Sequence, residues 1–104
     1  MNETISITSP AAIHENAVEH GWWETEREIP ELLCLIHSEV SEALEGYRNQ
    51  IPDGQKGCLA EELADVVIRI FDLCHRFDID IAAAVARKHE QNKLRSYRHG
   101  NKLC

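Results

Sequence analysis

Residues 59–77 read LAEELADVVIRIFDLCHRF, and this stretch decides the fold. If it coils as a helix, apolar side chains cover most of its circumference: Leu59, Leu63, Val66, Val67, Ile70, Phe71, Leu73 and Cys74. Charged residues interrupt this surface at steps of three, four and three, and fall within a stripe of roughly 80°: Glu62, Asp65, Arg69 and Asp72. Buried carboxylates cost several kcal/mol unless they are paired or bind a metal. The stretch therefore predicts a largely buried helix whose acidic stripe needs a cation.

A second helix is expected to precede this one. Pro30 opens a stretch with apolar residues at helical spacing, namely Leu32, Leu33, Ile36, Val40, Ala43, Leu44 and Tyr47. Between the two helices, residues 49–57 read NQIPDGQKG, where the Pro-Asp-Gly sequence favours a tight turn. A connection this short makes the two helices antiparallel neighbours.

The register of these two helices brings two acidic pairs to a similar height. Glu39 and Glu42 lie 14 and 11 residues before Asp53 in the turn, and Glu62 and Asp65 lie 9 and 12 residues after it. Taken alone, the first pair is better explained as two exposed carboxylates. The matching pair on the next helix predicts that four carboxylates meet.

The rest of the chain predicts two further helices. Ser9 and Pro10 are typical of a helix start, and Gly21 ends that helix near His20. Asp78 or Asp80 caps a fourth helix over residues 81–95, with Ile81, Ala84 and Val85 expected to face inward. Residues 1–8 are expected to form an extended lead-in and residues 97–104 a basic tail. The sequence thus predicts one all-α, four-helix domain over residues 1–104, with antiparallel second and third helices carrying the site.

Charge is unevenly distributed along the chain. The net charge of −7 argues against binding a nucleic acid polymer. Residues 1–86 hold 17 acids and 5 Lys/Arg, a sum of −12, whereas residues 87–104 hold 1 acid and 6 Lys/Arg, a sum of +5. An acidic body with a basic end suits a ligand that carries both a metal and phosphate. It equally suits a salt-bridged subunit contact or a solvated tail.

The sequence indicates a cytoplasmic protein that does not enter the membrane. No apolar run approaches the ~20 residues needed to cross a bilayer, and the first ten residues lack the features of a secretion signal. The four cysteines show no close metal-ligand spacing and are expected to be free thiols. Cys34 and Cys74 lie in apolar helical stretches, where cysteine usually behaves as a small buried hydrophobe.

A cluster of four carboxylates is a hard, all-oxygen site that suits Mg²⁺ or Mn²⁺. Such ions complete their coordination with phosphate oxygens, so the pattern favours metal-assisted hydrolysis of a phosphoryl group. Lys88 and Arg95 are expected to neutralise the remaining phosphates. A di-iron bundle would need two Glu-x-x-His motifs, and only Asp72xxHis75 comes near. Arg69 is expected to form an ion pair with Asp72 on its own helix.

Two adjacent tryptophans, Trp22 and Trp23, stand in an otherwise polar loop. Either can cover the end of the core, and either can serve as a flat platform for a nucleobase.

The sequence resembles the MazG-like all-α nucleoside triphosphate pyrophosphohydrolases in their short, single-domain form. The resemblance spans residues 21–102 and is carried by Glu39xxGlu42, by Glu61-Glu62xxAsp65, and by the phrases EVSEALEGYR, AEELADVVIRIFDL and KHEQNKLRSYRHGNK. It implies Mg²⁺-dependent cleavage of a nucleoside triphosphate between the α and β phosphates, which yields the monophosphate and pyrophosphate. It also implies a homodimer or homotetramer, a preference for deoxynucleotides and a house-cleaning role in the nucleotide pool.

The resemblance also implies roles for individual residues. Glu39, Glu42, Glu62 and Asp65 would be the metal ligands, and Glu61 or one of the metal-bound glutamates would activate the water. The motif at the end of the fourth helix would face phosphates or sugar, through Lys88, Asn92 and Arg95. Trp23, sixteen residues before Glu39, would contact the base, with Trp22 as the other candidate. The alternative is a catalytically silent helical interaction module whose acidic cluster holds a structural metal.

Overall fold

The computed structural model describes residues 8–95 of the chain. The predicted basic tail and nearly all of the predicted lead-in lie outside these residues. Four helices form, and their bounds are α1 (Pro10–Glu19), α2 (Ile29–Arg48), α3 (Leu59–Arg76) and α4 (Ile81–Lys93). No strand occurs between residues 8 and 95, so the predicted all-α architecture is confirmed for this part of the chain. No helix within these residues is long and apolar enough to cross a bilayer.

Local chemistry sets the ends of these helices. The Ser9 side chain accepts a hydrogen bond from the Ala12 backbone N–H at the start of α1, and Asp80 accepts one from Ala83 at the start of α4. Gly21, which follows α1, adopts a φ of +86° that a side chain would disfavour. The predicted caps therefore act where the sequence placed them.

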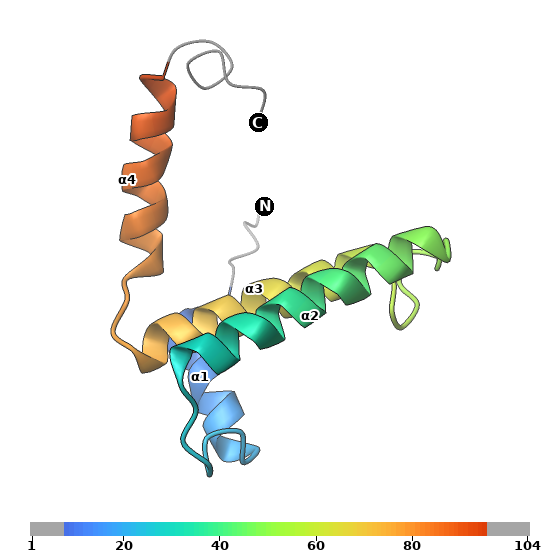
Figure 1. Ribbon diagram of the computed structural model, residues 1–104, viewed down its shortest axis with the longest axis horizontal. Helices are drawn as coiled ribbons and strands as arrows, with labels where there is room; N and C mark the ends of the chain where they lie inside the picture. Colours follow the sequence, from blue (N-terminus) through green and yellow to red (C-terminus); the bar gives the residue numbers. More distant parts are fainter. Residues whose placement is uncertain (1–7, 96–104) are drawn as a thin grey trace, which may run out of the picture.

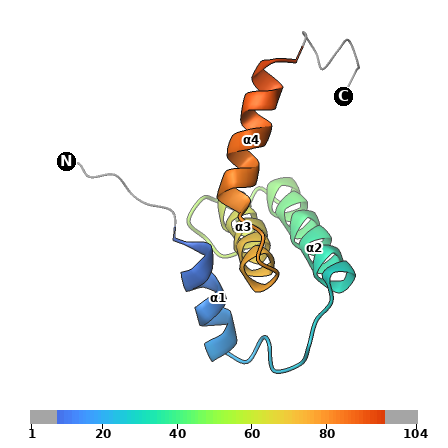
Figure 2. The same cartoon turned by 90° about the vertical axis from the view of Figure 1, so that its left-hand side faces the viewer.

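The middle helix of the fold is α3. On one side it runs alongside α2, to which a short loop joins it, and on the other side α1 packs against it (Figure 2). The buried core is small, and is formed by Leu32 of α2 with Leu73 and Cys74 of α3. Partly buried apolar residues surround it, namely Trp22, Trp23, Leu35, Ile36, Ile70 and Ile81. The core therefore lies at the end of the α2–α3 pair that is nearest the two tryptophans.

The loop between α2 and α3 lies very close to α2. A Cβ atom added at the buried Gly46 would come within 2.3 Å of the carbonyl oxygen of Gly57. Only glycine permits this approach of one backbone to another. The contact helps to fix where α3 begins, and with it the register of the two acidic pairs.

Apolar stripes along α2 and α3 are exposed, so the prediction that the third helix is largely buried is wrong for a single chain. They are formed by Leu33, Val40, Leu44 and Tyr47 on α2 and by Leu59, Leu63 and Val67 on α3. The helical period was read correctly, but α1 covers only part of α3.

The fourth helix and one cysteine also differ from expectation. α4 leaves the end of α3 and stands away from the other helices (Figure 1). Ile81 reaches the core, but Val85 is 59% exposed and does not face inward as predicted. Cys34 is exposed, whereas Cys58 and Cys74 are buried. These three are free thiols, and Cys104 lies outside the described residues.

Candidate metal centre and pocket

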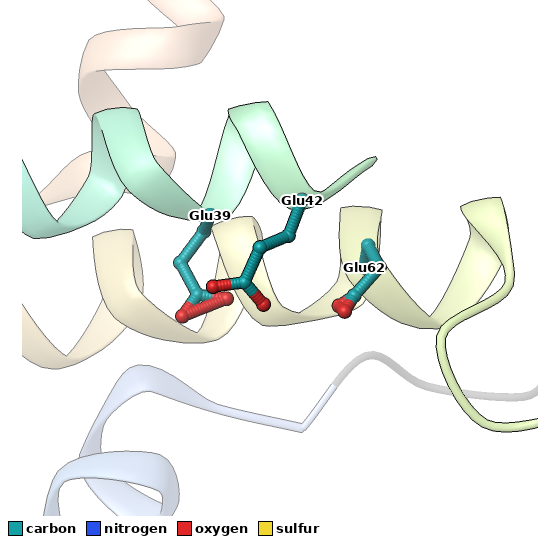
Figure 3. Close-up of side chains that lie close together, drawn as sticks. All are labelled: Glu39, Glu42 and Glu62. Atoms are coloured by element: carbon teal, nitrogen blue, oxygen red, sulfur yellow. The ribbon is translucent and has the colours of Figure 1, made fainter. Parts of the chain in front are cut away.

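Three of the four predicted carboxylates converge. Glu39 and Glu42 project from α2, and Glu62 projects from α3, so that one carboxylate oxygen of each lies within 4.8 Å of those of the other two. Figure 3 shows the three side chains pointing to the same side of the helix pair. Asp65, one turn further along α3, lies outside this group of three. We call Glu39, Glu42 and Glu62 the acidic cluster.

The acidic cluster is electrostatically unfavourable without a cation. Burial raises the pKa of Glu62, and the negative charges of Glu42, Asp65, Glu39 and Glu61 raise it further. The Oε2 atom of Glu62 is buried and has no hydrogen-bond partner among the described residues. An unsatisfied, partly desolvated carboxylate beside like charges is stabilised by a bound cation.

A pocket of about 670 Å³ lies beside this cluster, between α1 and the α2–α3 pair. We call the part of the pocket lined by Glu39 and Asp65 its acidic end. Two arginines, Arg27 and Arg69, also line the pocket. Small and apolar side chains line much of the rest, including Ala12, Ile13, Ala17 and Ile68. The pocket therefore offers both charges and an apolar wall.

Trp22 lines this pocket and makes cation–π contacts with two arginines. The Cζ atom of Arg27 lies 3.7 Å from the Trp22 ring centroid, and that of Arg69 lies 4.1 Å from it. The indole Nε1 of Trp22 is buried and has no hydrogen-bond partner among residues 8–95. Trp22 therefore positions the positive charges of the pocket.

Trp23 instead helps to hold the fold together. It packs against the core, and its Nε1 donates to Asp72 at 3.1 Å. Asp72 is 5% exposed, and its Oδ1 also lies 2.6 Å from Nδ1 of His14 on α1. The predicted ion pair between Arg69 and Asp72 is therefore wrong, because Arg69 pairs with Glu39 at 3.6 Å and Asp72 binds His14 and Trp23.

The remaining predicted site residues lie elsewhere. Lys88, Asn92 and Arg95 are exposed along the second half of α4 and just beyond it, and none of them lines the pocket. Glu61 is exposed and accepts a hydrogen bond from the backbone N–H of Gly57 at 3.2 Å, which ties the loop to the first turn of α3. Within one chain, the structure does not bring these four residues to the acidic cluster.

Sequence reasoning missed the pocket role of Arg27 and misplaced that of Arg69. A signal for Arg27 was present, because it is the only cation in the acidic loop ETERE of residues 24–28. No comparable signal marked the α1 face that lines the pocket, since small residues such as Ala12 and Ala17 also suit ordinary helix packing.

Comparisons of the chain with protein-family models, with curated proteins and with solved structures found no match.

Proposed function

We propose that this protein is a Mg²⁺-dependent nucleoside triphosphate pyrophosphohydrolase, which cleaves its substrate to the monophosphate and pyrophosphate. The observation that carries the proposal is the convergence of Glu39, Glu42 and Glu62 from two helices, with one Glu62 oxygen buried and without a hydrogen-bond partner among residues 8–95. The resemblance of the ExxE and EExxD motifs to MazG-like enzymes supports the same activity.

The donor set fits a hard divalent cation. Every candidate ligand in the acidic cluster is a carboxylate oxygen, which Mg²⁺ and Mn²⁺ prefer, and no cysteine or histidine takes part. We propose Glu39, Glu42 and Glu62 as ligands, with Asp65 reached by a second ion or through water. A cation bound there supplies Lewis-acid chemistry, because it neutralises phosphate oxygens and favours deprotonation of water.

The pocket suits a nucleotide placed with its phosphates at the acidic end. Two guanidinium groups and a bound cation would offset part of the triphosphate charge, while the apolar wall of α1 would accept the nucleoside. Asn16 and His20 of α1 also line this pocket and offer polar groups to a base. A deoxynucleotide and a house-cleaning role remain the preferred assignment from the sequence resemblance.

A homodimer or homotetramer is part of the proposal. The exposed apolar stripes of α2 and α3 would be covered by a second copy, which would remove several large side chains from water. Since α4 stands away from the pocket of its own chain, its Lys88, Asn92 and Arg95 would have to act in a site shared between copies in order to contact phosphates.

The alternative function is a catalytically silent interaction module with a structural metal. The same exposed apolar stripes favour it, because several large apolar side chains exposed along two helices are the type of surface that protein partners cover. Turnover separates the two functions, since only the enzyme releases pyrophosphate.

The test is a panel of ribo- and deoxynucleoside triphosphates with Mg²⁺ and separately with Mn²⁺, assayed for pyrophosphate. We expect release with at least one nucleotide. The Glu39→Gln and Asp65→Asn variants should lose more than about a hundredfold in turnover, because even outer-shell partners of a metal cost about 10–100-fold. Glu45→Gln, a neighbouring exposed carboxylate on α2, is the matched control and should turn over normally. No release with either cation would refute the enzyme, and full activity in Glu39→Gln would refute the metal site.

A further inference from the structure

Arg69 has an unusual position at the pocket. Its guanidinium lies over the Trp22 ring, with Cζ 4.1 Å from the centroid, and its side chain is 31% exposed. The nearest carboxylate is Glu39, at 3.6 Å between Nη2 and Oε1, which is an ion pair beyond hydrogen-bond distance. Among residues 8–95, the guanidinium of Arg69 makes no hydrogen bond.

Arg27 provides the contrast on the same indole ring. Its Nε donates to the Trp22 carbonyl oxygen at 2.9 Å, and its Nη1 donates to Glu31 at 2.8 Å. Two of its three side-chain nitrogens therefore donate within the loop and the first turn of α2. Arg27 braces Trp22, whereas Arg69 is held in orientation by the ring and keeps its N–H donors available.

A planar guanidinium with available donors is suited to a tetrahedral oxyanion. Stacking on an aromatic ring fixes the plane of the group while leaving its N–H edge open, and that edge matches two phosphate oxygens. Arg69 also stands beside the acidic cluster, since its ion-pair partner Glu39 is a member of that cluster. A phosphate chain bound to a cation at Glu39 would therefore come within reach of Arg69.

We propose that Arg69, oriented by Trp22, binds a phosphate group of the ligand and exchanges Glu39 for that phosphate when a divalent cation binds at the acidic cluster. This inference rests on the proposed function, because it names the phosphate-binding residue of the same pocket. It predicts that the binding of metal strengthens the binding of phosphate, and the reverse. The reason is that a cation bound to Glu39 neutralises its carboxylate, which then no longer competes with the phosphate for the Arg69 guanidinium.

The test compares wild type, Arg69→Gln and Arg76→Gln by calorimetric titration with inorganic triphosphate in Mg²⁺, and by titration with Mn²⁺ alone. Arg76 is the matched control, because it lies on the same helix and over the other tryptophan, at 4.7 Å from the Trp23 centroid, but does not line the pocket. We expect Arg69→Gln to weaken triphosphate binding by about tenfold or more, the usual effect of a lost charge-assisted hydrogen bond. Arg76→Gln should bind like wild type, and Arg69→Gln should bind Mn²⁺ at least as tightly.

Arg69→Lys keeps the charge without the planar fork, and serves if the glutamine variant does not fold. It should bind triphosphate more weakly than wild type and bind Mn²⁺ normally. Unchanged triphosphate affinity in the Arg69 variants, equal losses in Arg76→Gln, or a parallel loss of Mn²⁺ binding would each overturn the proposal. Because this test measures binding and not turnover, the role of Arg69 and the proposed enzymatic function can be refuted independently. Triphosphate binding through Arg69 with no hydrolysis would refute only the proposed function, and hydrolysis with unchanged binding in Arg69→Gln would refute only this inference.

Discussion

Removing the carboxylate of Asp72 should weaken the attachment of α1 and its following loop to α3. Asp72 is the only buried charged residue among those described, and it accepts hydrogen bonds from His14 of α1 and from Trp23 of the following loop. The change Asp72→Ala leaves both donors without their acceptor. Because α1 and this loop form one wall of the pocket, the same change should also disturb ligand binding.

The expected cost follows from the burial of the three groups. A hydrogen bond to a charged group contributes about 1.5–3 kcal/mol, and Asp72 accepts one from His14 and one from Trp23. The His14 side chain keeps 14% of its exposure, so water can replace part of what it loses. We therefore expect Asp72→Ala to lower the free energy of unfolding by about 3 kcal/mol, out of a total of about 5–15 kcal/mol for a domain. Asp72→Asn keeps an oxygen for Trp23 and should cost less.

The assay is urea unfolding followed by circular dichroism, with Asp53→Ala as a control on an exposed acid. Because Asp53 lies in the turn, Glu45→Ala on the exposed side of α2 is the stricter control, and it should lie within about 0.5 kcal/mol of wild type. A double-mutant cycle with His14→Ala should give a coupling energy of about 1 kcal/mol or more, because the two side chains are in direct contact. A loss below about 0.5 kcal/mol in Asp72→Ala, or a coupling energy near zero, would refute the reasoning.

Further consequences concern one glycine, one glutamate and the thiols. In an exposed helix, Gly→Ala would stabilise a protein by about 1 kcal/mol. We predict that Gly46→Ala instead destabilises this fold by about 2 kcal/mol in urea unfolding, because the added Cβ would clash with a backbone carbonyl. A variant more stable than wild type would contradict this. The pKa of Glu62 is raised in the folded state, so protonation of Glu62 favours folding. Without metal, the melting temperature should therefore fall as the pH rises above the ordinary pKa of a glutamate side chain. Glu62→Gln should remove that part of the pH dependence, and an unchanged profile would oppose the assignment. Burial raises the pKa of the Cys74 thiol, whereas Cys34 is exposed. Iodoacetamide should therefore label Cys34 well before Cys74, as mapped by mass spectrometry. Equal labelling rates of the two thiols would contradict the fold.

The helices could be predicted from sequence because their signals are local. Ser9 and Asp80 cap the helices they were expected to cap, and the turn at residues 52–54 sets the antiparallel pairing of α2 and α3. The register of the acidic pairs follows from counting residues on either side of that turn. Three of the four expected carboxylates converge for this reason, and Asp65 lies outside this group of three.

The partners of Arg69 and Asp72 could not be predicted in this way. Their spacing on one helix favoured a local ion pair, but Asp72 binds residues 58 and 49 positions away in the sequence. Those contacts depend on how α1 and its loop dock, which no helical period encodes. Periodicity likewise identifies the apolar side of a helix without saying whether another helix covers it, and so it could not predict which apolar side chains of α2 and α3 stay exposed in one chain.

The central claim is that the acidic cluster and its pocket cleave a nucleoside triphosphate between the α and β phosphates. The most direct measurement is a ³¹P NMR time course of the preferred nucleotide with the protein and Mg²⁺. We predict that monophosphate and pyrophosphate appear in equal amounts as the triphosphate disappears, and that Glu39→Gln abolishes both product signals. Release of orthophosphate with a nucleoside diphosphate, or no change in the spectrum, would contradict it.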